Sequence, residues 1–424
     1  MIPCLLVILF AGFLLMGLPV ALCLCLAAVV GMLLLGIPLE TFPQTLGMGM
    51  NSFPLLAVPF FILTGKIMNS GGITRRIFEM VNCVVGPFHG GLAQVNILSS
   101  LVFSGMSGAA VANAAGLGTV QVRAMKASGY DADFAVAVTA ASATMGPIFP
   151  PSIILVVYGI AAEAPINRLF LGGILPALLM AASLMVLTHV LALKRNYPRS
   201  PAVPFSVFTR HLLVALPALF TPVIIIGGTL GGIFTATEAG VVAVLYAVII
   251  GLFVYRELAL TDLPKLCIET MATTAMILFI VGAAASLGWI LTYYKIPTII
   301  STCIAMITQD RLTLLLLFTL LYLFLGCFME AAAIVVMTVP VVLPLLTTVG
   351  IDPIHFGIVL GMCMSIGTLT PPVGITMYVM CDIGKISTEQ FTRIILPFLI
   401  VLVADVLIVA FFPRLVLLLP SLVP

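Results

Sequence analysis

The feature that most constrains the fold is a series of long stretches without a single charged residue. Residues 1–39 contain no Asp, Glu, Lys or Arg, and the same is true of 80–122, 134–162, 169–193, 212–237, 270–294 and 353–381. A helix needs about 20 apolar residues to cross the hydrocarbon core of a bilayer, where a helix satisfies its own backbone hydrogen bonds. The chain is therefore predicted to be an all-α integral membrane protein with about ten spanning helices.

Composition excludes several other classes of protein. Of 424 residues, 62% are hydrophobic and 8% charged, whereas soluble domains carry about 25% charged residues. A net charge of +2 argues against a nucleic-acid partner. The nine cysteines contain no CxxC pair, and the four histidines show no metal-binding spacing or catalytic constellation. We expect no enzyme activity, no cofactor and one polytopic membrane unit over 1–424.

Positive charges predict the orientation of the spans. The start of the chain lacks the basic region of a signal peptide, so it is interpreted as a mature first helix. An outside N-terminus places thirteen Lys and Arg residues inside and four outside, as the positive-inside rule requires. The proline-rich stretch 194–210 is then a cytoplasmic linker, and 90–128 and 312–349 are predicted re-entrant hairpins. The spans are expected at roughly 3–17, 19–37, 53–67, 134–162, 166–193, 212–233, 236–255, 270–293, 354–380 and 394–413.

An internal repeat is visible when the chain is shifted by 221 residues. Without a gap, positions 105–176 match 326–397 at 15 of 72 residues, including Pro150-Pro151 on Pro371-Pro372. Five predicted crossings separate the two double prolines, so the copies have opposite orientation. Inverted-topology repeats with matching Gly and Pro interruptions are typical of secondary transporters. We assign 53–200 to the first repeat, 211–270 to connecting spans and 271–424 to the second repeat.

Each repeat contains a hairpin tip and a broken helix that could form a polar site. The first tip reads SGMSGAAVAN at 104–113, and the first break reads MGPIFPPS at 145–152. Proline withholds a backbone N–H and frees a carbonyl, and freed carbonyls, hydroxyls and the Asn113 amide are oxygen ligands suited to Na⁺. The second copy offers GCFME at 326–330 and GTLTPPVG at 367–374. A single proline would indicate only a kink. Two symmetric pairs predict one cation site per copy.

The charge of the transported solute follows from the helix ends. N-termini of half-helices carry partial positive charge, which favours an anionic substrate between the two sites. Neither tip nor break contains Lys or Arg. Glu330, at the second tip, is expected to have a polar role near the second cation site. Glu238 is interpreted as part of a helix cap, and Asp405 as a possible interhelical hydrogen-bond partner.

At these residues the chain resembles the large membrane subunit of tripartite ATP-independent periplasmic (TRAP) transporters, the DctM-like or SiaM-like family. The most specific segments are FSGMSGAAVANAAGLG at 103–118, MGPIFPPS at 145–152, TATEAG at 235–240 and GTLTPPVG at 367–374. The resemblance implies an elevator-type Na⁺ symporter of the bacterial inner membrane. It also implies a small four-helix membrane subunit (DctQ/SiaQ-like), a periplasmic binding protein (DctP/SiaP-like) and a C4-dicarboxylate, sialic acid or similar carboxylate as solute.

The resemblance also implies a set of site residues. Many members of the family have Ser and Asp where this chain has Ala109 and Asn113. The first Na⁺ site would comprise Ser104, Gly105, Ser107, Asn113, Gly146 and Pro150, and the second Gly326, Glu330, Gly367, Thr368 and Thr370. The substrate would lie between them, at Ser107, Pro150, Ser152, Thr370 and Pro371.

Two alternatives remain open from the sequence. A stand-alone carboxylate symporter or antiporter of similar hairpin architecture would need no binding protein. An intramembrane enzyme would require acids or histidines clustered at one membrane face, whereas here they are dispersed.

Overall fold

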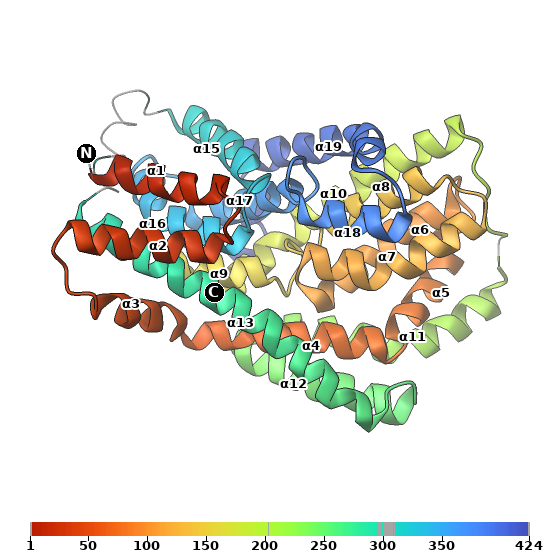
Figure 1. Cartoon of the computed structure of the whole chain (residues 1–424). Coiled ribbons are helices and arrows are strands. Elements are labelled where there is room, and N and C mark those ends of the chain that lie inside the picture. Colours follow the sequence, from red (N-terminus) through yellow and green to blue (C-terminus); the bar gives the residue numbers. More distant parts are fainter. Residues whose placement is uncertain (1, 202, 296–298, 300–307, 309, 423–424) are drawn as a thin grey trace.

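The computed structural model describes residues 2–201, 203–295, 299, 308 and 310–422, and every regular element in that part of the chain is helical. Figure 1 shows the helices gathered into one body. The first half contains α1 (Ile2–Leu15), α2 (Val20–Leu34), α3 (Thr41–Met50), η1 (Phe53–Leu56), α4 (Ala57–Ser70), α5 (Ile73–Val85), α6 (Gly91–Ser107), α7 (Ala110–Ala127), α8 (Ala132–Ala143), α9 (Ile153–Ala161) and α10 (Ile166–Lys194). The second half contains α11 (Phe205–Leu230), α12 (Ala236–Ile249), η2 (Ile250–Val254), η3 (Leu260–Asp262), α13 (Leu263–Tyr293), α15 (Arg311–Gly326), α16 (Ala331–Thr348), α17 (Pro353–Gly367), α18 (Ile375–Gly384), α19 (Thr388–Phe411), α20 (Arg414–Leu417) and η4 (Pro420–Leu422).

Seven helices in the described part of the chain are long and apolar enough to cross a membrane. Six coincide with predicted spans, and the seventh is α16, which was predicted as one arm of a hairpin. The predicted spans 134–162 and 354–380 each form two shorter helices, because the prolines interrupt them. The first two predicted spans correspond to α1 and α2, of 14 and 15 residues. The protein is an all-helical membrane protein, whereas membrane re-entry of the hairpins stays a prediction.

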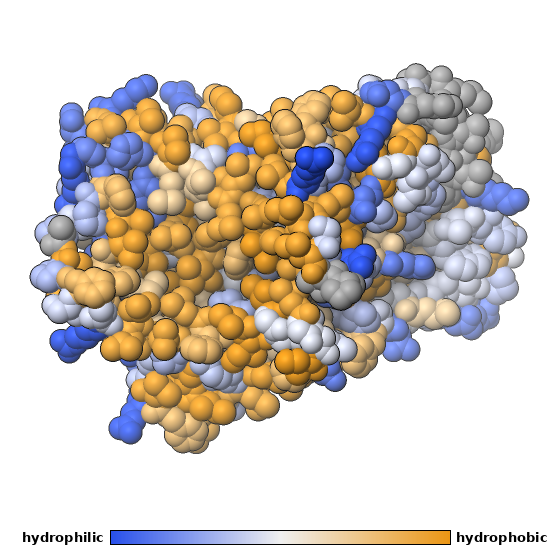
Figure 2. Space-filling view, turned by 180° about the vertical axis from the view of Figure 1, so that it is seen from behind, coloured by the Kyte–Doolittle hydropathy of each residue, from blue (hydrophilic) through white to orange (hydrophobic). Residues whose placement is uncertain are grey.

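The surface has the distribution of side chains that a bilayer requires. In Figure 2 apolar side chains form a broad band across the molecule, and hydrophilic side chains gather toward its two ends. Exposed aliphatic and aromatic residues on α11, η2 and α13, such as Leu213, Phe253 and Met271, contribute to this apolar surface. Such side chains lose nothing by exposure when the surrounding solvent is lipid.

The elements of the first copy recur in the second copy 221 residues later. The hairpin α6–α7 corresponds to α15–α16, and α8, α9 and α10 correspond to α17, α18 and α19. Both α7 and α16 have 18 residues, and their first residues, Ala110 and Ala331, are 221 positions apart. The Pro150-Pro151 and Pro371-Pro372 peptide bonds are both cis. In Figure 1 the two hairpins approach the middle of the molecule from opposite ends.

The two copies are interleaved rather than packed side by side. Helix α7 packs against α18 of the other copy, and α16 packs against α9 in the equivalent way. The Ser365 Oγ donates a hydrogen bond of 2.6 Å to the Thr144 carbonyl, and these two positions are equivalent in the repeat. A contact between equivalent positions lies on the local axis that relates the copies. The assigned limits of the repeats stay a prediction; the boundary between 270 and 271 falls inside α13.

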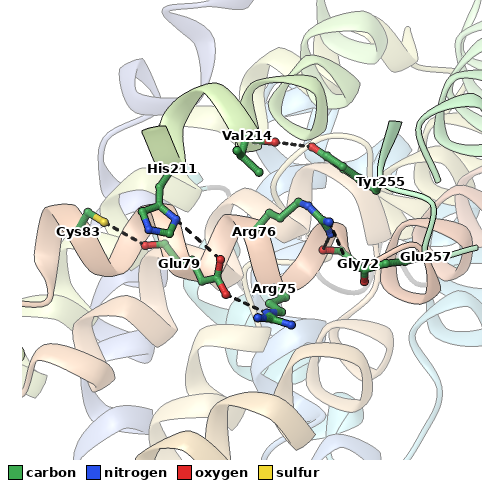
Figure 3. Close-up of polar contacts among 9 residues, drawn as sticks. All are labelled: Gly72, Arg75, Arg76, Glu79, Cys83, His211, Val214, Tyr255 and Glu257. Atoms are coloured by element: carbon green, nitrogen blue, oxygen red, sulfur yellow. Dashed lines mark hydrogen bonds and ion pairs between the residues drawn. The ribbon is translucent and has the colours of Figure 1, made fainter. Parts of the chain in front are cut away.

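One end of the molecule carries a network of charged side chains, which Figure 3 shows in close-up. We call it the linker end, because the α10–α11 connection also lies there. The Arg76 guanidinium pairs with Glu257 at 2.8 Å and lies 4.0 Å from the centre of the Tyr255 ring. The Tyr255 hydroxyl donates to the Val214 carbonyl at 2.8 Å. The network therefore joins α5 to α11 and to the α12–α13 connection.

Two carboxylates singled out in the sequence have clear structural partners. Glu238 forms a capping box with Thr235 at the start of α12, accepting from the Thr235 backbone N–H at 2.8 Å. Asp405 is 2% exposed and accepts a hydrogen bond of 2.5 Å from Ser183. Ser183 belongs to α10 and Asp405 to α19, so this bond joins two equivalent helices of the repeat. Both interpretations made from the sequence are confirmed.

We expect Ser183→Ala to lower the stability of the purified protein by roughly 1–3 kcal/mol, because a buried acceptor loses its donor. The measurement is the thermal unfolding midpoint in detergent. Thr392→Ala, which removes an exposed hydroxyl on α19, is the control and is expected to change stability by less than about 0.5 kcal/mol. Equal midpoints for the two variants would contradict the assignment of Asp405 as an interhelical anchor.

Candidate functional site

The two hairpin tips meet at a cavity of about 680 Å³ in the middle of the molecule. Ser107 and the first residues of α7 line it from one copy, and Gly326 to Ala331 line it from the other. Helices α4 and α13 form the opposite wall. Most of the lining is apolar, with a few polar groups, which is the usual composition of a small-molecule site.

Each tip is hydrogen-bonded to the break of its own copy. In the first copy the Ile153 N–H donates to the Gly108 carbonyl at 3.2 Å. In the second copy the Val373 N–H donates to the Cys327 carbonyl, also at 3.2 Å. Unpaired backbone groups are costly in an apolar interior, so these bonds stabilise both irregular segments inside the molecule.

Glycine allows each tip and break to approach at backbone distance. A Cβ atom on Gly146 would lie 3.0 Å from the Ala109 carbonyl carbon. A Cβ atom on Gly367 would lie only 2.4 to 2.6 Å from the backbone of Gly326. Gly146 and Gly367, two of the predicted site residues, therefore have to be glycine because the tip region and the break are in close contact.

A buried polar network supports the first tip. The Ser142 Oγ lies 3.1 Å from Asn96 Oδ1, to which it donates, and 2.9 Å from Ser100 Oγ, from which it accepts. The Asn113 Nδ2 donates to Ser104 Oγ at 3.0 Å. The Asn113 Oδ1 and the Ser107 Oγ are buried and have no protein partner among the described residues. Ser107 lines the cavity and Asn113 lies behind its lining, and unpaired oxygens there indicate a site for a ligand that accepts their lone pairs.

The second tip carries a carboxylate where the first has alanine. Glu330 precedes α16 and accepts from the N–H groups of Ala332 and Ala333 at 2.8 and 3.2 Å. The equivalent residue before α7 is Ala109, and no side chain of the described residues caps that helix. The N-terminus of α16 is therefore compensated by Glu330, whereas the N-terminus of α7 keeps its free N–H groups at the cavity.

The hydroxyls of the second break already have partners. Thr368 Oγ1 donates to the Ser365 carbonyl at 2.7 Å and accepts from Thr376 at 3.1 Å. Thr370 Oγ1 donates to the Ile366 carbonyl at 3.0 Å. Each oxygen keeps a lone pair, so either could still bind a cation.

The cavity brings together part of the predicted set. Ser107, Gly326, Glu330 and Thr368 line it, whereas Pro150, Ser152, Thr370 and Pro371 do not lie on its walls. Ser152 instead caps α9, accepting from the Leu155 N–H at 3.2 Å and donating to the Pro147 carbonyl at 2.5 Å. Ser104, Gly105, Asn113, Gly146 and Gly367 lie behind the lining, in the hairpins and the breaks.

Sequence reasoning missed the wall opposite the tips. Lys66 and Asn69 on α4 and Thr273 on α13 line the cavity, although neither helix belongs to a tip or a break. Lys66 is also the partner of Glu269, with Lys66 Nζ 3.3 Å from a Glu269 carboxylate oxygen. A lysine near the end of a predicted span was the only signal in the sequence, and it was counted among the thirteen positive charges predicted to lie inside.

A second cavity, of about 730 Å³, lies between the α9–α10 and α11–α12 connections. Its described lining includes Glu163, Asn167 and Glu238, but no residue of either tip or either break. None of the described residues that line this cavity carries a buried, unpaired side-chain oxygen or nitrogen, and Glu238 is used by its capping box. The cavity at the tips is therefore the better candidate site.

Comparisons with known proteins point to one family. A family model described as "Tripartite ATP-independent periplasmic transporter, DctM component" matches residues 7–415. The sialic acid TRAP transporter large permease protein SiaM of Vibrio cholerae is 42% identical over 413 residues, covering 97% of this chain and 96% of that protein. The C4-dicarboxylate TRAP transporter large permease protein DctM of Pseudomonas aeruginosa is 36% identical over 369 residues, covering 87% and 86%.

A solved structure supports the fold alone. The YdaH transporter of Alcanivorax borkumensis superimposes with a TM-score of 0.65, covering 88% of each chain, at 15% sequence identity.

We expect Gly367→Ala to destabilise the protein by about 1–3 kcal/mol, because its methyl group would overlap the Gly326 backbone. The thermal unfolding midpoint measures this loss. Gly361→Ala on the same helix is the matched control, since its methyl group would meet its nearest neighbours at 3.5 Å, an ordinary contact. If both variants have the same thermal unfolding midpoint, the second tip does not pack against the second break.

Proposed function

The chain belongs to the DctM component family of tripartite ATP-independent periplasmic transporters, and from this premise we propose that it carries out Na⁺-coupled symport of a carboxylate solute. It is a multi-pass large permease, not an enzyme. The observation that carries the proposal is two unpaired buried oxygens of the first hairpin, Ser107 Oγ on the wall of the cavity where both tips meet and Asn113 Oδ1 behind that wall.

The first Na⁺ ion would bind behind the first tip. Ser107 Oγ and Asn113 Oδ1 are 3% and 1% exposed as residues and lack partners among the described residues. Neutral oxygens of this kind, together with carbonyls near Gly146 and Pro150, are ligands suited to Na⁺ in broken-helix transporters. A bound cation would satisfy both orphaned oxygens.

The second Na⁺ ion would bind near the second tip and break. Gly326 and Gly367 hold these two segments in backbone contact, and the lone pairs of Thr368 and Thr370 remain available. Glu330 places a carboxylate at the same tip. A cation there would also lower the negative charge that Glu330 presents to an anionic solute.

The carboxylate of the solute would bind at the N-terminus of α7. That end has free N–H groups and the unpaired Ser107 hydroxyl, and both border the cavity. Backbone N–H groups at a helix N-terminus favour an anion through hydrogen bonds and the helix dipole. The corresponding end of α16 is less suitable, because Glu330 occupies its N–H groups.

Relatives provide the solute classes for the first experiments. One related large permease is named for sialic acid and another for C4-dicarboxylates, and both solutes carry carboxylates. We propose a solute of this class, delivered by a periplasmic binding protein and carried with a small four-helix membrane subunit. The transporter would reside in the bacterial inner membrane with its N-terminus in the periplasm. Its hairpins and broken helices would move as an elevator domain.

The coupling ion is tested by uptake of sialic acid and of succinate into proteoliposomes that contain the permease, its small subunit and the binding protein. We expect uptake to require an inward Na⁺ gradient and to fall at least tenfold when choline replaces Na⁺. Uptake that proceeds undiminished without Na⁺ would overturn the coupling. Uptake that needs no binding protein would favour the stand-alone carrier instead.

The first ion site is tested by Ser107→Ala. We expect this variant to need several-fold more Na⁺ for half-maximal uptake, because one ligand oxygen is lost. Thr188→Val is the matched control: it removes another buried hydroxyl that has no partner among the described residues but does not line the cavity. An unchanged Na⁺ requirement in Ser107→Ala would exclude Ser107 as a ligand.

A further inference from the structure

Lys66 is the one positively charged residue among the described residues that line the cavity. It lies on α4, one turn before that helix ends at Ser70. The preceding residue, Gly65, brings α4 against the first tip, since a Cβ atom there would lie 3.2 Å from the Ser107 Cα. Both Gly65 and Lys66 line the cavity, so Lys66 lies beside the point where α4 contacts the first tip.

The present partner of Lys66 can be exchanged. Lys66 Nζ is 3.3 Å from a carboxylate oxygen of Glu269 on α13, with side-chain exposures of 28% and 46%. A partly exposed ion pair gains little over its hydrated, separated members. A carboxylate that enters the cavity can therefore replace Glu269 without a large loss.

The surroundings make a single positive charge effective. Apolar residues such as Phe103, Ile153 and Ile277 line the same cavity, and charges interact more strongly beside low-dielectric walls than in water. The other charged residue of the described lining is Glu330, which repels an anion and is held at the start of α16. An anion in the cavity therefore has one cationic partner among the described lining residues.

We propose that Lys66 is a specificity-determining residue, whose ammonium group exchanges Glu269 for the acidic group of the solute as it moves between the first tip and the linker end. This inference rests on the proposed function. It adds a side-chain contact on α4 to the site at the hairpin tips. The cavity thereby favours anions over neutral solutes of the same size.

The experiment measures initial uptake of sialic acid and succinate in the complete proteoliposome assay. We expect Lys66→Gln to reduce uptake of the transported anion at least tenfold and Lys66→Arg to retain most of it. Lys385→Gln removes a lysine from an exposed ion pair outside the cavity and is expected to behave as the wild type. Thermal unfolding midpoints of all variants identify samples that fail to fold.

The charge-reversed double variant separates specificity from structure. Lys66→Glu combined with Glu269→Lys keeps an ion pair at the same place but turns the negative member toward the cavity. We expect it to remain folded and inactive. Restored uptake in this variant, or wild-type uptake in Lys66→Gln, would overturn the inference and leave the proposed function intact. A wild-type protein that takes up neither anion would contradict both the inference and the proposed function.

Discussion

The structure depends on the requirement that every backbone polar group at membrane depth finds a partner inside the protein. The chain meets this requirement at its irregular segments by pairing each tip with a break. The Gly108 carbonyl receives the Ile153 N–H, and the Cys327 carbonyl receives the Val373 N–H. A hairpin that left its break would expose two polar groups to an apolar interior. Tip and break are therefore expected to move as one unit, so the site would stay intact during any movement of the hairpins.

The repeated backbone carries different side chains in its two copies. Ala109 corresponds to Glu330, Ser107 to Phe328, and Asn113 to Ile334. The first tip consequently presents unpaired oxygens and a free helix end, whereas the second presents a carboxylate and apolar groups. Symmetry supplies two positions for binding, and divergence at a few residues assigns them different chemistry. In the proposed mechanism the first tip binds a cation and the anion side by side, whereas the second tip binds a cation only.

The sequence predicted the parts of the fold that depend on local chemistry. The segments left between the predicted spans match two helix pairs to within one residue at each end, since 90–128 and 312–349 became Gly91–Ala127 and Arg311–Thr348. The cap at Glu238 was readable because Thr235 and Glu238 have the spacing of a capping box.

The walls of the cavity could not be predicted in the same way. They bring α4 and α13 together across about 200 residues of sequence, as the Lys66–Glu269 pair shows. Lys66 was counted only as one of the inside charges, because nothing in its own segment indicates what packs opposite it. The start of α13 was also missed, since Lys265 and Glu269 looked like the end of the apolar region but lie on exposed parts of the helix.

On the axis between the copies, the Ser365 hydroxyl donates to the Thr144 carbonyl of the other copy, whereas the Thr144 hydroxyl donates to the Ala141 carbonyl within its own copy. A transport cycle that exchanged the environments of the two copies would not form the equivalent bond from Thr144 to Ser365. The inward-open and outward-open forms of such a carrier would then differ in free energy even without solute or ion. One of the two forms would predominate in the empty carrier, although the backbone repeats almost symmetrically.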